Sequence, residues 1–302
     1  MTDIDEFKAK TRSVFHDLHV KQGDDPKIFN RLKSLLSTQY LEVADDFFVG
    51  KTCLDAGCGS NANAVASMLS QGAHHVIGMD LDNSIMIAAQ KNLHEFEGRF
   101  ELRAGDVHHI PFPDGTFDFT HCSGVLHHSS DIFKGLVELA RVTKPGGTLY
   151  IMVYGIGGIM RVCTTVLRQR YQTEPAFTQL IDALTASEIR AWIRSGFALM
   201  KSHGDNWCEG VTAADIDMLF DDDLVLTIKD RIQAPVYLEC SEEDLVLSLE
   251  QQGFREVKRI SRYPKLENIR RILSPYYFDY ASPLARILYG SGCIQLKATK
   301  GL

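Results

Sequence analysis

LDAGCGSNANA, which spans Leu54–Ala64, is the stretch that best indicates the fold of this chain. A short apolar run leads into it, and an alanine-rich segment typical of a helix follows it. Gly57, Gly59 and Ala62 have the spacing G-x-G-x-x-G/A of a turn that joins a buried strand to a helix and lets a ligand approach the backbone. We therefore expect an α/β sheet with a ligand site at this turn.

Strands and helices alternate along the chain around this turn. Short apolar strands are typical of a parallel sheet covered on both faces, and the alternation is that of a doubly wound fold. The pattern predicts strands near residues 51–56, 75–80, 99–104, 117–122 and 147–153, and helices near 61–71, 83–96 and 131–143.

The rest of the chain adds helices and completes the sheet. Residues 155–235 have a mainly helical pattern, and an addition at this place is expected above the carboxyl ends of the strands, where ligands bind. The last two strands are predicted at residues 254–260 and 291–298. The fold class is therefore α/β, with a doubly wound, mostly parallel seven-stranded sheet and a helical insert. The predicted parts are an N-terminal helical lid at 1–50, an α/β core at 51–154, a mainly helical substrate lid at 155–240 and the completion of the core sheet at 241–302.

Composition narrows the class of protein. The chain has 302 residues, of which 45% are hydrophobic and 24% charged, as in ordinary globular proteins. The net charge of −7 disfavours nucleic acid as a partner. No apolar run approaches about 18 residues, so we expect no membrane span. The seven cysteines include no C-x-x-C pair and the N-terminus does not resemble a signal peptide, which together predict a reducing, cytoplasmic setting.

Asp55, two residues before Gly57, distinguishes between two classes of ligand. A dinucleotide places its pyrophosphate at the N-terminus of the helix, where a nearby carboxylate repels it. S-adenosylmethionine (SAM) instead carries a sulfonium and an α-ammonium, both cationic, so a carboxylate near it is favourable. The glycines fit both ligands, and the charge of Asp55 favours SAM.

Two further acids follow the next predicted strands. Asp80 ends the second strand, where a carboxylate accepts hydrogen bonds from ribose hydroxyls in either ligand class. Asp82 is the neighbouring alternative, although it is expected to cap the next helix. Asp106 follows the third strand and suits the adenine amino group, which is a donor. The alternative for Asp106 is a turn residue that binds its own backbone.

Five motifs occur in one order: LDAGCGS, VIGMD, AGDVHHIPFPDGTFD, GVLHH and LARVTKPGGTLYIMVY. In order and spacing they resemble the class I SAM-dependent methyltransferases, most closely the small-molecule branch that includes the ubiquinone- and menaquinone-type methylases. The resemblance covers roughly residues 50–154. It implies that Asp55, Gly57 and Gly59 line the methionine end of SAM, that Asp80 holds the ribose with Leu81 on the adenine, that Asp106 meets the adenine amino group beside Val107, and that Ser123 approaches the sulfonium. Asn61 stands where the family often has a third glycine.

Position suggests the catalytic candidates, because methyl transfer needs alignment more than acid–base chemistry. His127 and His128 follow the fourth predicted strand, near the expected methyl group. A histidine there is a candidate general base. The favoured alternative is a structural or pocket-shaping role for this pair.

Candidates for binding the acceptor lie further along the chain. Tyr154 closes the fifth strand, and Arg161 after it suits an acidic acceptor through a bidentate contact. The alternative for Arg161 is a residue at a helix start that faces solvent. Tyr276 and Tyr277 are candidates for the wall of an acceptor pocket, with packing in the core as the alternative. We expect no metal site, because the acidic run at 221–223 is better explained as a helix cap.

The sequence thus predicts a SAM-dependent methyltransferase that acts on a small molecule, with oxygen or carbon weakly preferred as the acceptor atom. A non-catalytic SAM-fold binding module and a dinucleotide-dependent oxidoreductase are the alternatives. The sequence names neither the acceptor nor the oligomeric state.

Overall fold

The chain is built around one sheet, seen here in a computed structural model that describes residues 9, 11, 15, 26–82, 85–205, 209–260, 268–270 and 282–302. The strand order is β3-β2-β1-β4-β5-β7-β6. The predicted seven-stranded sheet is confirmed. Its strands are β1 (Thr52–Ala56), β2 (His75–Asp80), β3 (Phe100–Ala104), β4 (Phe117–Ser123), β5 (Thr143–Tyr154), β6 (Phe254–Arg259) and β7 (Cys293–Lys300).

Strand directions agree with the predicted, mostly parallel fold. The pairs among β1 to β5 are parallel, whereas β7 runs antiparallel to both β5 and β6. The register places Asp55 opposite His121, and His121 opposite Tyr150. It also places Ser123 opposite Met152. Side chains of neighbouring strands therefore form rows across the sheet near its carboxyl edge.

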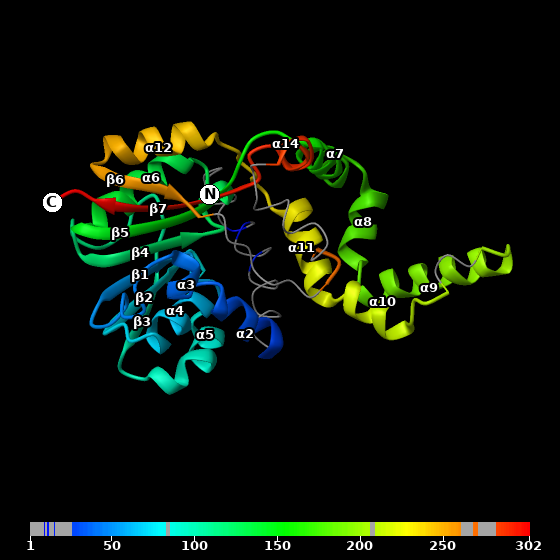
Figure 1. Cartoon of the computed structure of the whole chain (residues 1–302), viewed down its shortest axis with the longest axis horizontal. Coiled ribbons are helices and arrows are strands. Elements are labelled where there is room, and N and C mark those ends of the chain that lie inside the picture. Colours follow the sequence, from blue (N-terminus) through cyan, green and yellow to red (C-terminus); the bar gives the residue numbers. More distant parts are fainter. Residues whose placement is uncertain are drawn as a thin grey trace.

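Helices cover both faces of the sheet (Figure 1). On one face, a core with Phe48, Met68 and Phe119 packs under the N-terminal helices. On the other face, a second core contains Leu136 and Leu249. Burial on both faces explains why the central strands are almost continuously apolar. The first set of helices is α2 (Pro26–Ser34), α3 (Thr38–Leu41), α4 (Asn63–Ser70), α5 (Ile85–Leu93) and η1 (His94–Phe96), and the second is α6 (Ile132–Val142) and α12 (Glu242–Gln251).

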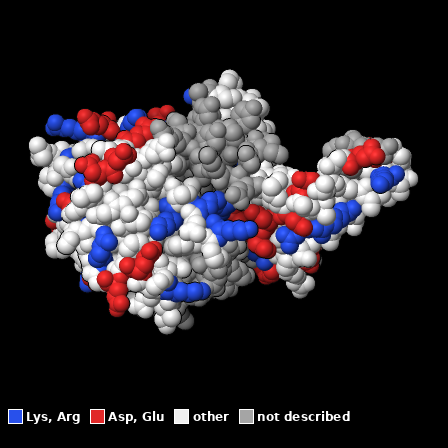
Figure 2. Space-filling view, turned by 60° about the horizontal axis from the view of Figure 1, so that its bottom comes forward, with Lys and Arg blue, Asp and Glu red and all other residues white. Residues whose placement is uncertain are grey.

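A helical arm follows β5 and lies beyond the carboxyl ends of the strands (Figure 1). Figure 2 shows the arm projecting from the body, with acidic and basic side chains interspersed over the visible face. The chain returns from the arm where Leu238 N donates to His127 O at 2.8 Å. The arm contains α7 (Ile159–Thr173), α8 (Pro175–Ala183), α9 (Ala186–Ser202), α10 (Ala213–Leu219) and α11 (Asp222–Gln233); the short helices η2 (Leu126–His128) and α14 (Pro283–Tyr289) lie beside its root.

The length and hydropathy of the helices bear on membrane insertion. Within the described ranges, no helix combines the length and apolar character that crossing a membrane requires.

Candidate functional site

Close contacts around the glycine turn after β1 leave no room for a side chain at Gly57. Gly57 has φ +89°, a region that favours glycine. A Cβ atom at Gly57 would lie 2.1 Å from Cγ2 of Val125. The N–H groups of Gly57 and Cys58 both donate to Met79 O, at 2.6 and 3.1 Å. The turn is thus fixed against the end of β2.

Asp80 completes this turn. Its Oδ2 accepts from Gly59 N at 2.9 Å, and its Oδ1 accepts from Asp82 N at 3.1 Å. The carboxylate therefore joins the end of β2 to the second glycine of the motif. Asp80, the acid favoured for the ribose, thus contacts the glycine turn directly.

Asp106 takes part in a local turn after β3. Its Oδ1 accepts from His108 N at 2.9 Å, which is the backbone-binding geometry weighed as the alternative to adenine binding. Val107 is buried in the core beneath α6. Leu81 is half-buried just after β2.

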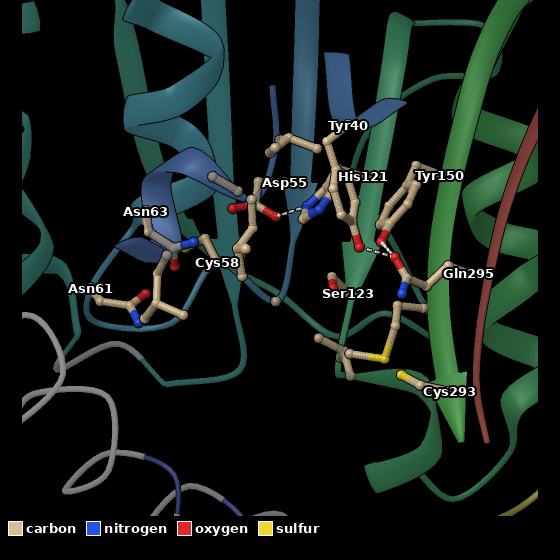
Figure 3. Close-up of a pocket in the computed structure, with 17 residues that line it drawn as sticks. Tyr40, Asp55, Cys58, Asn61, Asn63, His121, Ser123, Tyr150, Cys293 and Gln295 are labelled. Carbon is tan, nitrogen blue, oxygen red and sulfur yellow. Dashed lines mark hydrogen bonds and ion pairs between the residues drawn. The ribbon is translucent and has the colours of Figure 1, made fainter. Parts of the chain in front are cut away.

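A cavity of about 280 Å³ lies between α2, α3 and one face of β1, β4, β5 and β7 (Figure 3). Three residues predicted for the cofactor line it, namely Asp55, Gly57 and Ser123. The other predicted cofactor residues, Gly59, Asp80, Leu81, Asp106 and Val107, are outside its lining. The lining consists of Leu32, Leu35, Leu36, Tyr40, Asp55, Gly57, Cys58, Asn61, Asn63, Ala64, His121, Ser123, Val125, Tyr150, Met152, Cys293 and Gln295.

His121 is a cavity residue that the sequence analysis missed. Its Nδ1 lies 2.7 Å from Asp55 Oδ1, and both side chains are buried. The imidazole also stacks on the ring of Tyr150, with centroids 5.2 Å apart and planes 6° apart. The signal available in the sequence was a histidine in an otherwise buried strand. A period of two would have placed it on one face with Ser123.

A second polar group on the cavity floor joins three elements. The hydroxyl of Tyr150 donates to Gln295 Oε1 at 2.9 Å, and the hydroxyl of Tyr40 donates to the same oxygen. Burial raises the pKa of both tyrosines well above their ordinary range. The hydroxyls are therefore neutral donors at physiological pH.

Cys58 lies in the same lining, within the glycine turn. Burial, and then the neighbouring Asp80 and Asp55 carboxylates, raise the pKa of its thiol well above the ordinary value. A protonated thiol is a poor nucleophile. Cys58 is therefore better explained as a small residue that fits the turn than as a catalytic group.

The structure brings together four predicted residues in a second cluster beside the carboxyl end of β5. The ring of Tyr154 stacks on that of His127, with ring centroids 3.7 Å apart. The ring centroids of His127 and His128 are 4.3 Å apart. The guanidinium of Arg161 lies 4.4 Å from the Tyr154 ring. Tyr237, which the sequence analysis did not select, has its ring centroid 5.1 Å from that of Tyr154. We call these five residues the Tyr154 cluster.

Arg161 is buried, so its predicted alternative as a solvent-facing residue is wrong. It is 5% exposed, and its Nη2 donates to Gly292 O at 2.9 Å. Its Nε lies 3.8 Å from Glu239, beyond hydrogen-bonding distance. Its Nη1 has no hydrogen-bond partner among the described residues. The packing of α7 at the end of β7 holds this cation inside the protein.

The two histidines of the Tyr154 cluster have different surroundings. His127 is fully buried, and neither ring nitrogen finds a hydrogen-bond partner in the described part of the chain. Burial, and then His128 and Arg161, lower the pKa of His127 well below its ordinary value. By contrast, His128 Nδ1 lies 2.9 Å from Val236 O, and its Nε2 lies 3.7 Å from Asp230.

The remaining candidates concern the aromatic wall and metals. Tyr276 and Tyr277 lie outside the described residues. Asp221 caps α11 by accepting from Leu224 N at 2.9 Å, as predicted. The described residues include no group of three or more His, Cys, Asp or Glu side chains that could hold a metal ion.

Comparison with known proteins places this geometry in a family. Residues 54–151 match the family described as methyltransferase domain. The stretch that carries the five motifs is therefore similar to a methyltransferase domain. The resemblance of its five motifs to SAM-dependent methyltransferases of the quinone-methylase type is thereby confirmed.

Curated relatives are similar to this part of the chain. An uncharacterized methyltransferase of Schizosaccharomyces pombe is 36% identical over 109 residues, which are 33% of this chain and 39% of the relative. A demethylmenaquinone methyltransferase of Halalkalibacterium halodurans is 37% identical over 100 residues, 32% of this chain and 41% of the relative. The match thus spans about two fifths of each of these relatives.

A solved structure extends the similarity of fold over the whole chain. The 1,6-didemethyltoxoflavin-N1-methyltransferase of Burkholderia thailandensis has a TM-score of 0.51 and 16% identity, and the match covers 100% of this chain and 92% of that one. That structure holds 1,6-didemethyltoxoflavin and S-adenosylhomocysteine. At this identity the likeness concerns the fold alone.

Proposed function

We propose that this protein transfers the methyl group of SAM to a small-molecule acceptor, with oxygen or carbon preferred as the acceptor atom. The observation that carries the proposal is the glycine turn flanked by Asp55 and Asp80, within the stretch that matches the methyltransferase domain. When bound, SAM supplies a methyl group already activated by its sulfonium. The protein then needs chiefly to align the acceptor with that carbon.

The residues near the turn suit the cofactor by their chemistry. Asp55 is a buried carboxylate with room beside it, which favours a cationic group. A side chain at Gly57 would collide with Val125, so the bare backbone keeps this part of the cavity open. We assign the methionine end to Asp55, Gly57, Gly59 and Ser123, the ribose to Asp80, and the adenine to Leu81, Asp106 and Val107.

We place the acceptor at the Tyr154 cluster. Buried polar atoms without hydrogen bonds are costly, and a ligand that pairs with them removes that cost. Among the described residues, no partner reaches Arg161 Nη1, either nitrogen of His127 or Tyr237 Oη. A guanidinium suits an acidic acceptor. Tyr154 and Arg161 therefore retain their predicted role in binding the acceptor, with Tyr237 added.

The lowered pKa of His127 bears on its role. A histidine whose pKa lies well below the ordinary value is a weak base at neutral pH. We therefore assign His127 to shaping the pocket and holding the acceptor rather than to removing its proton. His128, which contacts Val236 and Asp230, remains the candidate base of the pair.

Two helical segments are proposed lids. The N-terminal helices α2 and α3 contribute Leu32 and Tyr40 to the lining of the cavity, and the link between them contributes Leu36. The arm, with α7 and α11, encloses the Tyr154 cluster. Lids of this kind exclude water and hold an acceptor in line. Limited proteolysis should show slower cleavage in both segments when S-adenosylhomocysteine is bound.

Calorimetric titration with S-adenosylhomocysteine and with NAD tests the proposal. Folded protein should bind S-adenosylhomocysteine and not NAD, because Asp55 repels a pyrophosphate. Incubation with methyl-labelled SAM and a panel of small acids, phenols and amines should then transfer label to at least one acceptor. Binding without transfer to any panel member favours the non-catalytic module, and NAD binding favours the oxidoreductase.

A further inference from the structure

Asp55 and His121 form a buried pair on the cavity floor. They lie on adjacent strands, opposite each other in the register of β1 and β4. Because an ionised carboxylate only accepts hydrogen bonds, Nδ1 of His121 must carry the proton that Oδ1 of Asp55 receives over 2.7 Å. A neutral His121 therefore keeps its lone pair on Nε2.

The pair presents two further acceptors. Figure 3 shows one oxygen of Asp55 directed at the imidazole and the other turned away from it. Among the described residues, no hydrogen bond reaches Asp55 Oδ2 or His121 Nε2, and neither atom is a fully buried one without a partner. A carboxylate oxygen and an imidazole lone pair together suit a group with several N–H donors and a positive charge.

Few charges surround this pair. Asp55 is the one cavity-lining residue that is ionised at neutral pH when His121 is neutral. Tyr150 from β5 and Tyr40 from α3 stay protonated because burial raises their pKa, and so does Cys58, which faces Asp55 from the glycine turn. The other polar members are uncharged, and α2 contributes leucines. The lining thus carries one negative charge with neutral His121, and none once His121 is protonated.

We propose that Asp55 and His121 act as one unit that receives the α-ammonium group at the methionine end of the cofactor, and that protonation of His121 weakens cofactor binding. This inference rests on the SAM binding proposed above and adds His121 as a positioning residue. The hydrogen bond from His121 sets the direction of the second oxygen of Asp55. Protonation adds a donor at Nε2 and cancels the charge of the pair, so both attractive features are lost.

Titration calorimetry between pH 5.5 and 8.0 tests this role, since histidines change charge between about pH 5 and 8. The two probes are S-adenosylhomocysteine and 5′-methylthioadenosine, which lacks the amino-acid end. From pH 8.0 to 5.5 the affinity for S-adenosylhomocysteine should fall roughly tenfold, in line with the loss of a hydrogen bond to a charged group. The affinity for 5′-methylthioadenosine should stay constant.

His121→Asn is the matched variant, because its amide N–H replaces Nδ1 as the donor to Asp55 but does not titrate. Its affinity for S-adenosylhomocysteine at pH 8.0 should stay within about threefold of the wild-type value, and its pH dependence should disappear. His121→Phe keeps a ring on Tyr150 but loses the donor, so its affinity should fall at every pH. Thermal melting identifies any variant that is unfolded.

The outcomes separate the two proposals. No binding of S-adenosylhomocysteine by the wild-type protein at any pH overturns the proposed function. Normal binding with a flat pH profile, or an unchanged slope in His121→Asn, overturns only the role of His121. A profile for 5′-methylthioadenosine that parallels the other ligand also overturns it, because that probe has no α-ammonium.

Discussion

The cavity and the Tyr154 cluster are both polar and buried, but they differ in how their polar groups are paired. In the cavity, Asp55 is bonded to His121, and the hydroxyl of Tyr150 is bonded to Gln295. In the cluster, His127 and Arg161 bury polar atoms that have no partner in the described part of the chain. Each such atom costs about 1–3 kcal/mol. The polar groups of the cavity thus hold one another in place, whereas we propose that a ligand pairs with the polar atoms of the cluster.

The largest effect is expected where the paired groups hold the proposed cofactor. Asp80→Ala removes the acceptor for Gly59 N and the proposed ribose contact. We expect S-adenosylhomocysteine to bind more weakly by roughly 1.5–3 kcal/mol, as for the loss of hydrogen bonds to a charged group. Calorimetry measures this change. Asp82→Ala is the control. An equal loss of affinity in that variant would contradict the assignment of the ribose to Asp80.

The cluster should make stability depend on pH through His127. Its pKa in the folded state is lowered, so below about pH 6.5 the unfolded chain binds a proton that the folded chain does not. The free energy of unfolding should therefore fall as the pH decreases, by up to about 1.4 kcal/mol per pH unit for this one proton. Urea unfolding at pH 7, 6 and 5 measures the slope. His127→Phe should remove the contribution of this one proton from the slope. An unchanged slope would contradict the lowered pKa of His127.

The smallest effect, and the sharpest contrast, lies within the histidine pair. His127→Phe keeps the ring that stacks on Tyr154 and removes two buried nitrogens that have no partner among the described residues, so we expect the protein to gain about 1 kcal/mol of stability. His128→Phe is the matched control. It breaks the contact between Nδ1 and Val236 O and should destabilise the protein by a similar amount. Denaturant unfolding of both variants compares them, and destabilisation by His127→Phe would mean that its nitrogens are paired.

The fold was largely predictable because it follows from local patterns. The stretches 75–80 and 117–122, predicted as strands, became β2 and β4 with nearly the same limits. Gly57 was recognised from its spacing, and the collision of a Cβ atom with Val125 gives the reason for it. Chain order alone also placed Asp80 at a strand end, since the carboxyl ends of parallel strands meet at one edge.

The site was only partly predictable because several of its contacts join distant segments. Asp55 and His121 are 66 residues apart, and their contact depends on the register of β1 against β4. The buried guanidinium of Arg161 donates to Gly292 O, 131 residues away. The sequence did not distinguish the roles of His127 and His128. Their different surroundings, Tyr154 for His127 and Val236 O for His128, follow only from the packing.

By itself, the sequence determined the alternating sheet, the glycine turn and the acids at successive strand ends. These features follow from periodicity, backbone freedom and chain order, which are local properties. The tertiary structure alone decided that Asp55 pairs with a histidine and that Arg161 is buried. Both depend on which side chains meet across strands and helices far apart in the chain, and burial then fixes how strongly their charges act.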